Sequence, residues 1–344
     1  MRRVSFKTWL SLITLALVVV ILYAARNELV RAWHLLGQVN PWVLLVLLPT
    51  QVLSYYAAGA MVFSYLKEKF YLNVPPAEAA KIALELNFVN HILPSAGVSG
   101  ASYMTWRLGK LGVNPGRATL AQVVRFAATF AAFLVLLLIA VVAITLDNGL
   151  ERIPILVASG LASVIIIGTL LTVYVIQSKP RLHRTAAFIT RHVNATWKSV
   201  MRQPKPLLKQ EAVNTFFEDL HGDYCELSRD PSVLKKPFLW GIVFVISEVS
   251  LFWITFWALG TPINPAPLLI AYGLAGFAGS FFFTPGGVGG YEALMVAFLA
   301  ASGIDKGAVI AATLLSRAIL MLLTIVSGYY FYQHALNKYG KHES

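Results

Sequence analysis

Five ionisable side chains lie inside long apolar stretches of this sequence, and they are the first candidates for chemistry. They are Glu85, Arg125, Glu248, Glu292 and Arg317. A charged group costs free energy in an apolar environment, so such residues face a polar cavity or a partner of opposite charge. We expect these side chains to handle a charged substrate.

Glu292 and Arg317 lie on either side of one short loop, so their helices can pack and their side chains can meet. The pair is either a buried ion pair that satisfies only itself or a pair that exchanges partners with a lipid headgroup. In the second case the arginine binds phosphate through two hydrogen bonds and the glutamate binds an ammonium group. We favour the second interpretation.

Four polar residues, Glu85, Asn87, Asn90 and His91, lead into Pro94. Spacings of four and five residues predict that one broad helix face holds all of them. They either line the cytoplasmic half of the same path or satisfy the interrupted backbone near Pro94, and both interpretations stay open.

Two turns rich in glycine and proline interrupt the apolar runs. The first contains Pro94, Ser95, Gly97 and Gly100, and the second contains Pro285, Gly286, Gly287, Gly289 and Gly290. Inside a membrane, an irregular turn is tolerated only where protein or trapped water satisfies its backbone groups, so each turn predicts a cavity. Helices that start at Ala101 and Tyr291 would point their N-terminal N–H groups at an anion such as a lipid phosphate.

Patterns typical of enzymes and metal sites are missing from the sequence. The single cysteine, Cys225, cannot form an internal disulfide, and no cysteines and histidines cluster at metal-ligand spacing. No nucleotide-binding phosphate loop is present. We expect no catalytic residue, no metal and no cofactor.

The composition assigns the candidate residues to a membrane protein. Of 344 residues, 57% are hydrophobic and 13% are charged, and the mean hydropathy is +0.67. Soluble domains are about 45–50% apolar and about 25% charged. The net charge of +12 is concentrated near the ends of apolar runs, as the positive-inside rule requires. We expect a multi-pass protein of a bacterial inner membrane that does not bind nucleic acid.

The apolar runs predict the membrane topology. They cover residues 8–25, 41–66, 77–93, 118–146, 153–176, 237–259, 267–283, 291–301 and 308–331. The first run follows a basic start and is long enough to be an uncleaved anchor rather than a signal peptide. The polar segment 177–236 holds eleven basic and six acidic residues, so we expect a cytoplasmic loop with short amphipathic helices.

All basic clusters fall on the cytoplasmic side only if residues 77–110 and 267–303 each enter and leave the membrane on the same side. The predicted fold is an all-α integral membrane protein with about six full spans, two re-entrant hairpins and both termini in the cytoplasm. The turns recur at an offset of about 190 positions. This offset predicts an inverted repeat of residues 77–146 and 266–333, in which Arg125 is the counterpart of Arg317. Glu248 could pair with either arginine.

Two segments carry a resemblance to a known family. Asn-His-Ile-Leu-Pro-Ser-Ala-Gly at 90–97 and Thr-Pro-Gly-Gly-Val-Gly-Gly-Tyr-Glu at 284–292 resemble the membrane flippase part of the lysylphosphatidylglycerol synthase and flippase family. The likeness extends from the first anchor to about residue 331. It implies a lipid-handling membrane protein in which Glu292 and Arg317 lie where the family carries its membrane-embedded acidic and basic residues. The chain ends at Ser344, so lysyl transfer by a soluble domain is not expected.

The preferred hypothesis is a flippase-like lipid translocase that moves a phospholipid or polyprenyl-linked headgroup. The expected headgroup path consists of Glu292, Arg317, Arg125, Glu85, Asn87, Asn90 and Glu248. Its expected partners are membrane lipids with anionic headgroups. One alternative is a membrane-embedded transferase that acts on lipid-linked substrates. Another is a membrane partner for a separate cytoplasmic transferase, which residues 179–236 would recruit.

Overall fold

The computed structural model describes residues 39–93, 98–148, 152–201, 210–279 and 289–339, with a few positions between 23 and 37. These residues form helices joined by short connections, including the 3-10 helix η1 (Pro231–Leu234). Most of the predicted anchor lies outside the described residues. The same is true of six predicted turn residues: Pro94, Ser95, Gly97, Pro285, Gly286 and Gly287.

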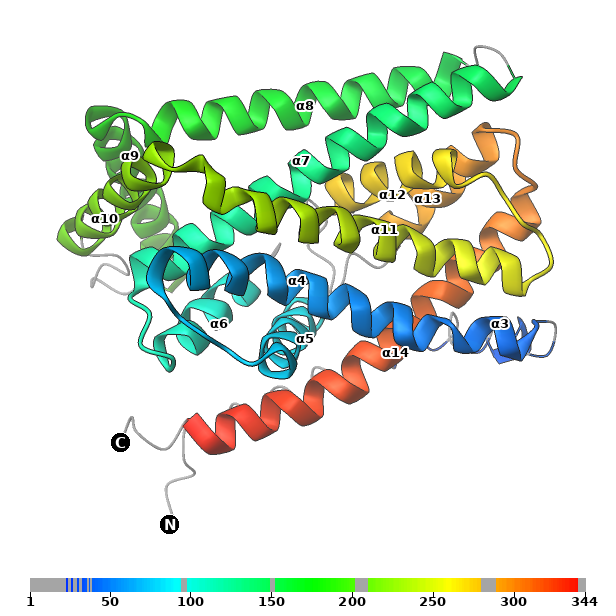
Figure 1. Ribbon diagram of the computed structural model, residues 1–344, viewed down its shortest axis with the longest axis horizontal. Coiled ribbons are helices and arrows are strands. Elements are labelled where there is room, and N and C mark those ends of the chain that lie inside the picture. Colours follow the sequence, from blue (N-terminus) through cyan, green and yellow to red (C-terminus); the bar gives the residue numbers. More distant parts are fainter. Residues whose placement is uncertain are drawn as a thin grey trace.

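Five helices in the described part are long and apolar enough to cross a membrane. They are α4 (Leu47–Phe70, preceded by the short α3, Pro41–Leu45), α7 (Pro115–Asn148), α8 (Arg152–Ile176), α11 (Lys235–Ala258) and α14 (Lys306–Tyr339). Figure 1 shows them extending along the length of the molecule. The prediction of an all-α integral membrane protein is confirmed.

Four shorter helices form two pairs. The first pair is α5 (Pro76–Ile92) with α6 (Val98–Gly109), and the second is α12 (Pro265–Gly279) with α13 (Gly290–Ala301). At 1.5 Å per residue they are about 18–25 Å long, less than the roughly 30 Å of a bilayer's hydrocarbon core. In each pair the two helices pack against each other.

Contacts across α5 and α6 establish that the two helices are antiparallel. The Glu78 side chain contacts Arg107, and the Asn90 side chain contacts Gly100. The start of α5 therefore lies beside the end of α6, and the chain reverses its direction between the two helices. This is the connectivity that a hairpin requires.

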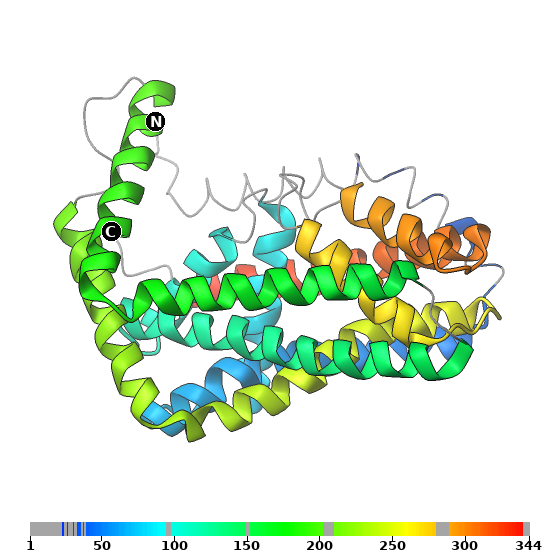
Figure 2. The ribbon, with the colours of Figure 1, turned by 90° about the horizontal axis from the view of Figure 1, so that it is seen from above.

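One end of the molecule carries α9 (Lys179–Met201) and α10 (Gln210–Arg229). Figure 2 shows both helices at that end, running across the long helices rather than beside them. Leu220 and Leu227 of α10 share a buried apolar cluster with Leu66 of α4 and Ala118 of α7. We call this the basic end; the last turns of α14 also lie there (Figure 1).

Helix α5 is packed closely between two long helices through glycines. A Cβ at Gly59 of α4 would lie 2.5 Å from the backbone oxygen of Ala79. A Cβ at Gly328 of α14 would lie 2.5 Å from the Cβ of Phe88. Since small residues let helix backbones approach in a membrane, these contacts fix the position of α5 and its polar side chains.

Gly59→Val should destabilise the protein by about 1–3 kcal/mol, because the valine side chain would overlap the backbone of α5, which cannot rotate away. The measurement is the midpoint of thermal unfolding in detergent. The matched control is Gly160→Val on α8, where no described residue lies within 4 Å of the added Cβ. Equal midpoints for the two variants would contradict the proposed close packing.

Candidate functional site

Glu292 and Arg317 form an ion pair between α13 and α14. Arg317 Nε lies 2.8 Å from Glu292 Oε1, and the side chains are 20% and 15% exposed. The guanidinium also lies over the ring of Tyr291, with Cζ 4.5 Å from the ring centroid. We call Glu292 and Arg317 the central pair. Because neither side chain is fully buried, another polar group can reach them.

The start of α13 holds Glu292 in place. Gly289 precedes the helix with φ of +92°, a conformation that a residue with a Cβ rarely adopts. Its N–H donates to Glu292 Oε2 at 2.7 Å, and Glu292 is the third residue of the helix, as in a capping box. A carboxylate at this position also interacts favourably with the positive end of the helix dipole.

The helix geometry gives the depth of the central pair. Arg317 is eleven residues into α14, or about 17 Å along the helix axis. This is about half the thickness of the hydrocarbon core, which is roughly 30 Å. The central pair therefore lies well inside the apolar body of the protein.

Glu248 of α11 lies near the central pair. It accepts hydrogen bonds from Ser54 of α4 and, at 3.5 Å, from Tyr272 of α12. Among the described residues Glu248 forms no ion pair, so its carboxylate is bound by hydroxyl groups instead of an arginine. Arg317 still interacts with both Glu248 and His91 electrostatically. Polar groups from both halves of the chain thus converge around Arg317.

Arg125 is ten residues into α7 and differs from Arg317 in having no carboxylate partner among the described residues. Its Nε is buried and donates to no acceptor in the described part of the chain. The guanidinium lies 4.7 Å from the ring centroid of Phe126. Within the described structure, Arg125 is a cation without a hydrogen-bonded counterion.

The polar residues of α5 do not lie on one face, so that prediction is wrong. Glu85 binds α6 side chains and Asn90 accepts from Gly100 N at 3.0 Å, whereas Asn87 and His91 bond to backbone oxygens of α5. At about 100° per residue, Glu85 and Asn87 point to nearly opposite sides of the helix. Asn87, Asn90 and His91 lie on one side of the helix, and Glu85 points away from them.

A glycine near the start of α6 allows close contact with the Asn90 side chain of α5. A Cβ at Gly100 would lie 2.2 Å from Asn90 Oδ1, the atom that accepts the Gly100 N–H. The absence of a side chain at Gly100 thus allows α5 and α6 to pack closely. Gly290 begins α13, directly after Gly289.

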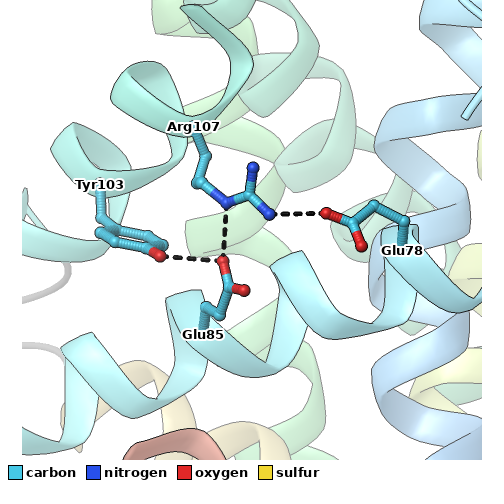
Figure 3. Close-up of polar contacts among 4 residues, drawn as sticks. All are labelled: Glu78, Glu85, Tyr103 and Arg107. Atoms are coloured by element: carbon cyan, nitrogen blue, oxygen red, sulfur yellow. Dashed lines mark hydrogen bonds and ion pairs between the residues drawn. The ribbon is translucent and has the colours of Figure 1, made fainter. Parts of the chain in front are cut away.

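A second buried cluster, the Arg107 cluster, was not predicted from the sequence. Arg107 of α6 is 2% exposed; its Nη2 lies 2.7 Å from Glu78 Oε1 and its Nε lies 2.9 Å from Glu85 Oε2. Tyr103 donates its hydroxyl to Glu85 at 2.8 Å. Figure 3 shows these four side chains between the two helices of the hairpin.

The sequence held a signal for this cluster. Glu78 and Glu85 are seven residues apart and therefore lie on the same side of α5, two turns from each other. Arg107 is the only charged residue of α6. A hairpin that pairs the start of α5 with the end of α6 brings them together, but the register of that pairing is not encoded in either helix alone.

The two clusters offer the same chemistry at different depths. In each, a guanidinium can bind a phosphate through paired hydrogen bonds, and carboxylates can bind an ammonium group. The Arg107 cluster lies at the basic end, since Glu78 is in the first turn of α5. The central pair lies about a third of the way along α14, nearer the end of that helix that is opposite to Tyr339.

A comparison with models of protein families identifies the family of this chain. The model of the lysylphosphatidylglycerol synthase transmembrane region matches residues 9–328, which include α4, α7, α8, α11 and both pairs of short helices and end within α14. No curated protein matches the chain. Because the match covers most of the sequence, the chain belongs to the lysylphosphatidylglycerol synthase family, through its transmembrane region.

Proposed function

We propose that this protein translocates lipids, moving a phospholipid or polyprenyl-linked headgroup across a bacterial inner membrane. The family links the chain to membrane lipids, and a multi-pass protein of this kind is in contact with them. The basic end would face the cytoplasm, because Lys and Arg accumulate on that side of membrane proteins. Since α14 ends there, the C-terminus would also lie in the cytoplasm.

The observation that carries this proposal is the partly exposed central pair. A buried ion pair whose donors and acceptors are all satisfied can be purely structural, and apolar residues of similar size often replace such a pair without loss of stability. The central pair instead keeps 15–20% of its side-chain surface accessible at mid-depth, where charges are costly. A polar headgroup needs such groups, because it loses its water on entering the membrane.

The proposed chemistry is an exchange of partners. Arg317 would release Glu292 and bind the phosphate, while Glu292 would keep its hydrogen bond from Gly289 N and accept any ammonium group of the headgroup. Glu248 would balance the charge around Arg317, with which it interacts electrostatically. Arg317 would thus have an anionic partner at each stage, and Glu292 would exchange Arg317 for the ammonium group of a headgroup that has one or keep only the Gly289 N–H where the headgroup has none.

The helix lengths support an inverted repeat as the frame for this path. Helices α4 and α11 each have 24 residues, α6 and α13 each have 12, and α7 and α14 each have 34. α7 begins near the basic end, whereas α14 ends there. Two such repeats of opposite orientation are a recurring architecture of transporters, with binding sites where broken helices meet.

Glu292→Gln and Arg317→Gln should each reduce lipid translocation at least tenfold, because each removes one partner of the exchange. The measurement is the transbilayer movement of fluorescent phosphatidylglycerol in liposomes that contain the purified protein. A matched control is the double variant Arg184→Gln/Glu211→Gln, which removes one charge of each sign from the exposed surface of α9 and α10.

The reversed pair, Glu292→Arg/Arg317→Glu, separates transport from folding. It keeps one charge of each sign and should recover part of the thermal stability lost in the single variants, because the ion pair is restored but an arginine at the start of α13 cannot accept the Gly289 N–H. Transport should stay low, because the phosphate-binding group now lies on the wrong helix. Normal transport by both single variants, or the absence of transport of any anionic lipid by the wild type, would contradict the proposed function.

Arg125→Met should lower lipid translocation without lowering thermal stability. The substitution removes a guanidinium that has no hydrogen-bonded counterion among the described residues, and an uncompensated charge in an apolar environment is unfavourable. The measurement combines the liposome assay with thermal unfolding in detergent. A lower unfolding temperature with unchanged transport would assign Arg125 a structural role instead.

A further inference from the structure

A cavity lies beside the Arg107 cluster at the basic end. It has a volume of about 220 Å³ and lies between the start of α5, the end of α6 and the last turns of α14. The residues that bear on its chemistry are Glu78, Lys81, Glu85, Arg107, Lys338 and Tyr339. Pockets for whole small molecules are about 300–1,000 Å³, so this cavity fits a headgroup rather than a complete lipid.

Arg107 lines this cavity and has an unused hydrogen-bond donor. Its Nε and Nη2 bind the two glutamates, but its Nη1 is buried and has no partner among the described residues. The guanidinium is held against the ring of Tyr339, with Cζ 4.5 Å from the centroid. A buried donor without an acceptor is unfavourable, so a ligand that supplies an acceptor oxygen gains binding energy there.

The charges around the cavity favour an anion. Three cationic side chains, Lys81, Arg107 and Lys338, face two carboxylates, Glu78 and Glu85. Both carboxylates are already bound by Arg107. Within the described structure the two lysines form no ion pair; their amino groups lie 5.7 Å and 5.2 Å from the nearest aromatic ring centroids. The lysines are therefore available for a negatively charged ligand.

The depth of the cavity places it at the level of lipid headgroups. On α14 it extends over positions 330–339, which begin thirteen residues after Arg317. This separation is about 20 Å along the helix. With Arg317 near the middle of a hydrocarbon core about 30 Å thick, the cavity lies just outside that core.

We infer that this cavity is a second phosphate-binding site, separate from the central pair. Lys81 and Lys338 attract the phosphate, and Arg107 Nη1 donates to it. The ligand is a phosphate ester of a membrane lipid or free inorganic phosphate, which offer the same chemistry. The inference rests on the proposed function in one respect: a lipid phosphate bound here is loaded at the basic end before it reaches Arg317.

The test uses the two lysines, because both are exposed and their loss leaves the fold intact. Arg107 is unsuitable, since its removal would leave Glu78 and Glu85 without their partner and would destabilise the hairpin. The test variant is Lys81→Gln/Lys338→Gln. The matched control is Lys67→Gln/Lys179→Gln, which removes the same charge from exposed positions at the basic end outside the cavity.

The measurement is the stabilisation of the detergent-purified full chain against thermal unfolding as ligand is added. The probes are dihexanoylphosphatidylglycerol, inorganic phosphate and dihexanoylglycerol, which has no phosphate. We expect the phosphatidylglycerol to bind the test variant at least tenfold more weakly than it binds the wild type and the control variant. Dihexanoylglycerol should not stabilise any of them.

The arms of the experiment distinguish the sources of the phosphate. Stabilisation by inorganic phosphate alone, lost in the test variant, would identify a free-phosphate site. Stabilisation by the lipid alone would identify a headgroup site. Equal stabilisation of wild type and test variant by every phosphate ligand, or stabilisation by dihexanoylglycerol, would overturn the inference.

The liposome assay separates this inference from the proposed function. If the test variant loses binding while the wild type transports no lipid, the cavity remains a phosphate site and the proposed function fails. If the wild type transports lipid, and the test variant binds phosphate ligands and transports lipid as well as the wild type does, the cavity is not a phosphate site. The proposed role of the central pair is then unaffected.

Discussion

The structure is organised by the cost of placing charge in an apolar environment. A charged side chain in a membrane must be paired, hydrated or bound to a ligand. This constraint explains why Glu292 meets Arg317 and why Glu78 and Glu85 both bind Arg107. It also makes Arg125 notable, because in the described structure its charge is met by the face of a phenylalanine ring rather than by a carboxylate. The charges that the fold leaves accessible are those with which a lipid headgroup can interact.

The hairpins are the second consequence of the same constraint. A helix that spans the whole bilayer satisfies its backbone internally and offers no polar end at mid-depth. The short helix α13 begins inside the apolar body instead, and its first turn holds Glu292 through the N–H of Gly289. In the first hairpin, α6 similarly begins beside the Asn90 side chain. Short helices therefore bring polar groups to a depth that long helices leave apolar.

The sequence predicted the helical membrane fold and the family. It also predicted the contact between Glu292 and Arg317, because a short loop joins their two helices. It did not predict the Arg107 cluster, whose partners are 22 and 29 positions apart and meet only through the register of α5 against α6. The predicted single polar face of α5 was wrong because Glu85 and Asn87 point to opposite sides. Local spacing thus identified residues within one helix or across one short loop, while contacts between helix faces required the packed structure. The glycines at Gly59 and Gly328 that set this packing could not be distinguished from other membrane glycines by sequence.

The central claim is that Arg317 binds the phosphate of a lipid headgroup. The most direct measurement is nitrogen–phosphorus dipolar coupling by solid-state NMR, on protein with ¹⁵N-labelled arginine side chains in phosphatidylglycerol bilayers. The account predicts a coupling that corresponds to hydrogen-bonding range and that loses a component in Arg317→Gln. A coupling pattern that is unchanged by this substitution would contradict the account, because it would mean that Arg317 binds Glu292 and no lipid phosphate.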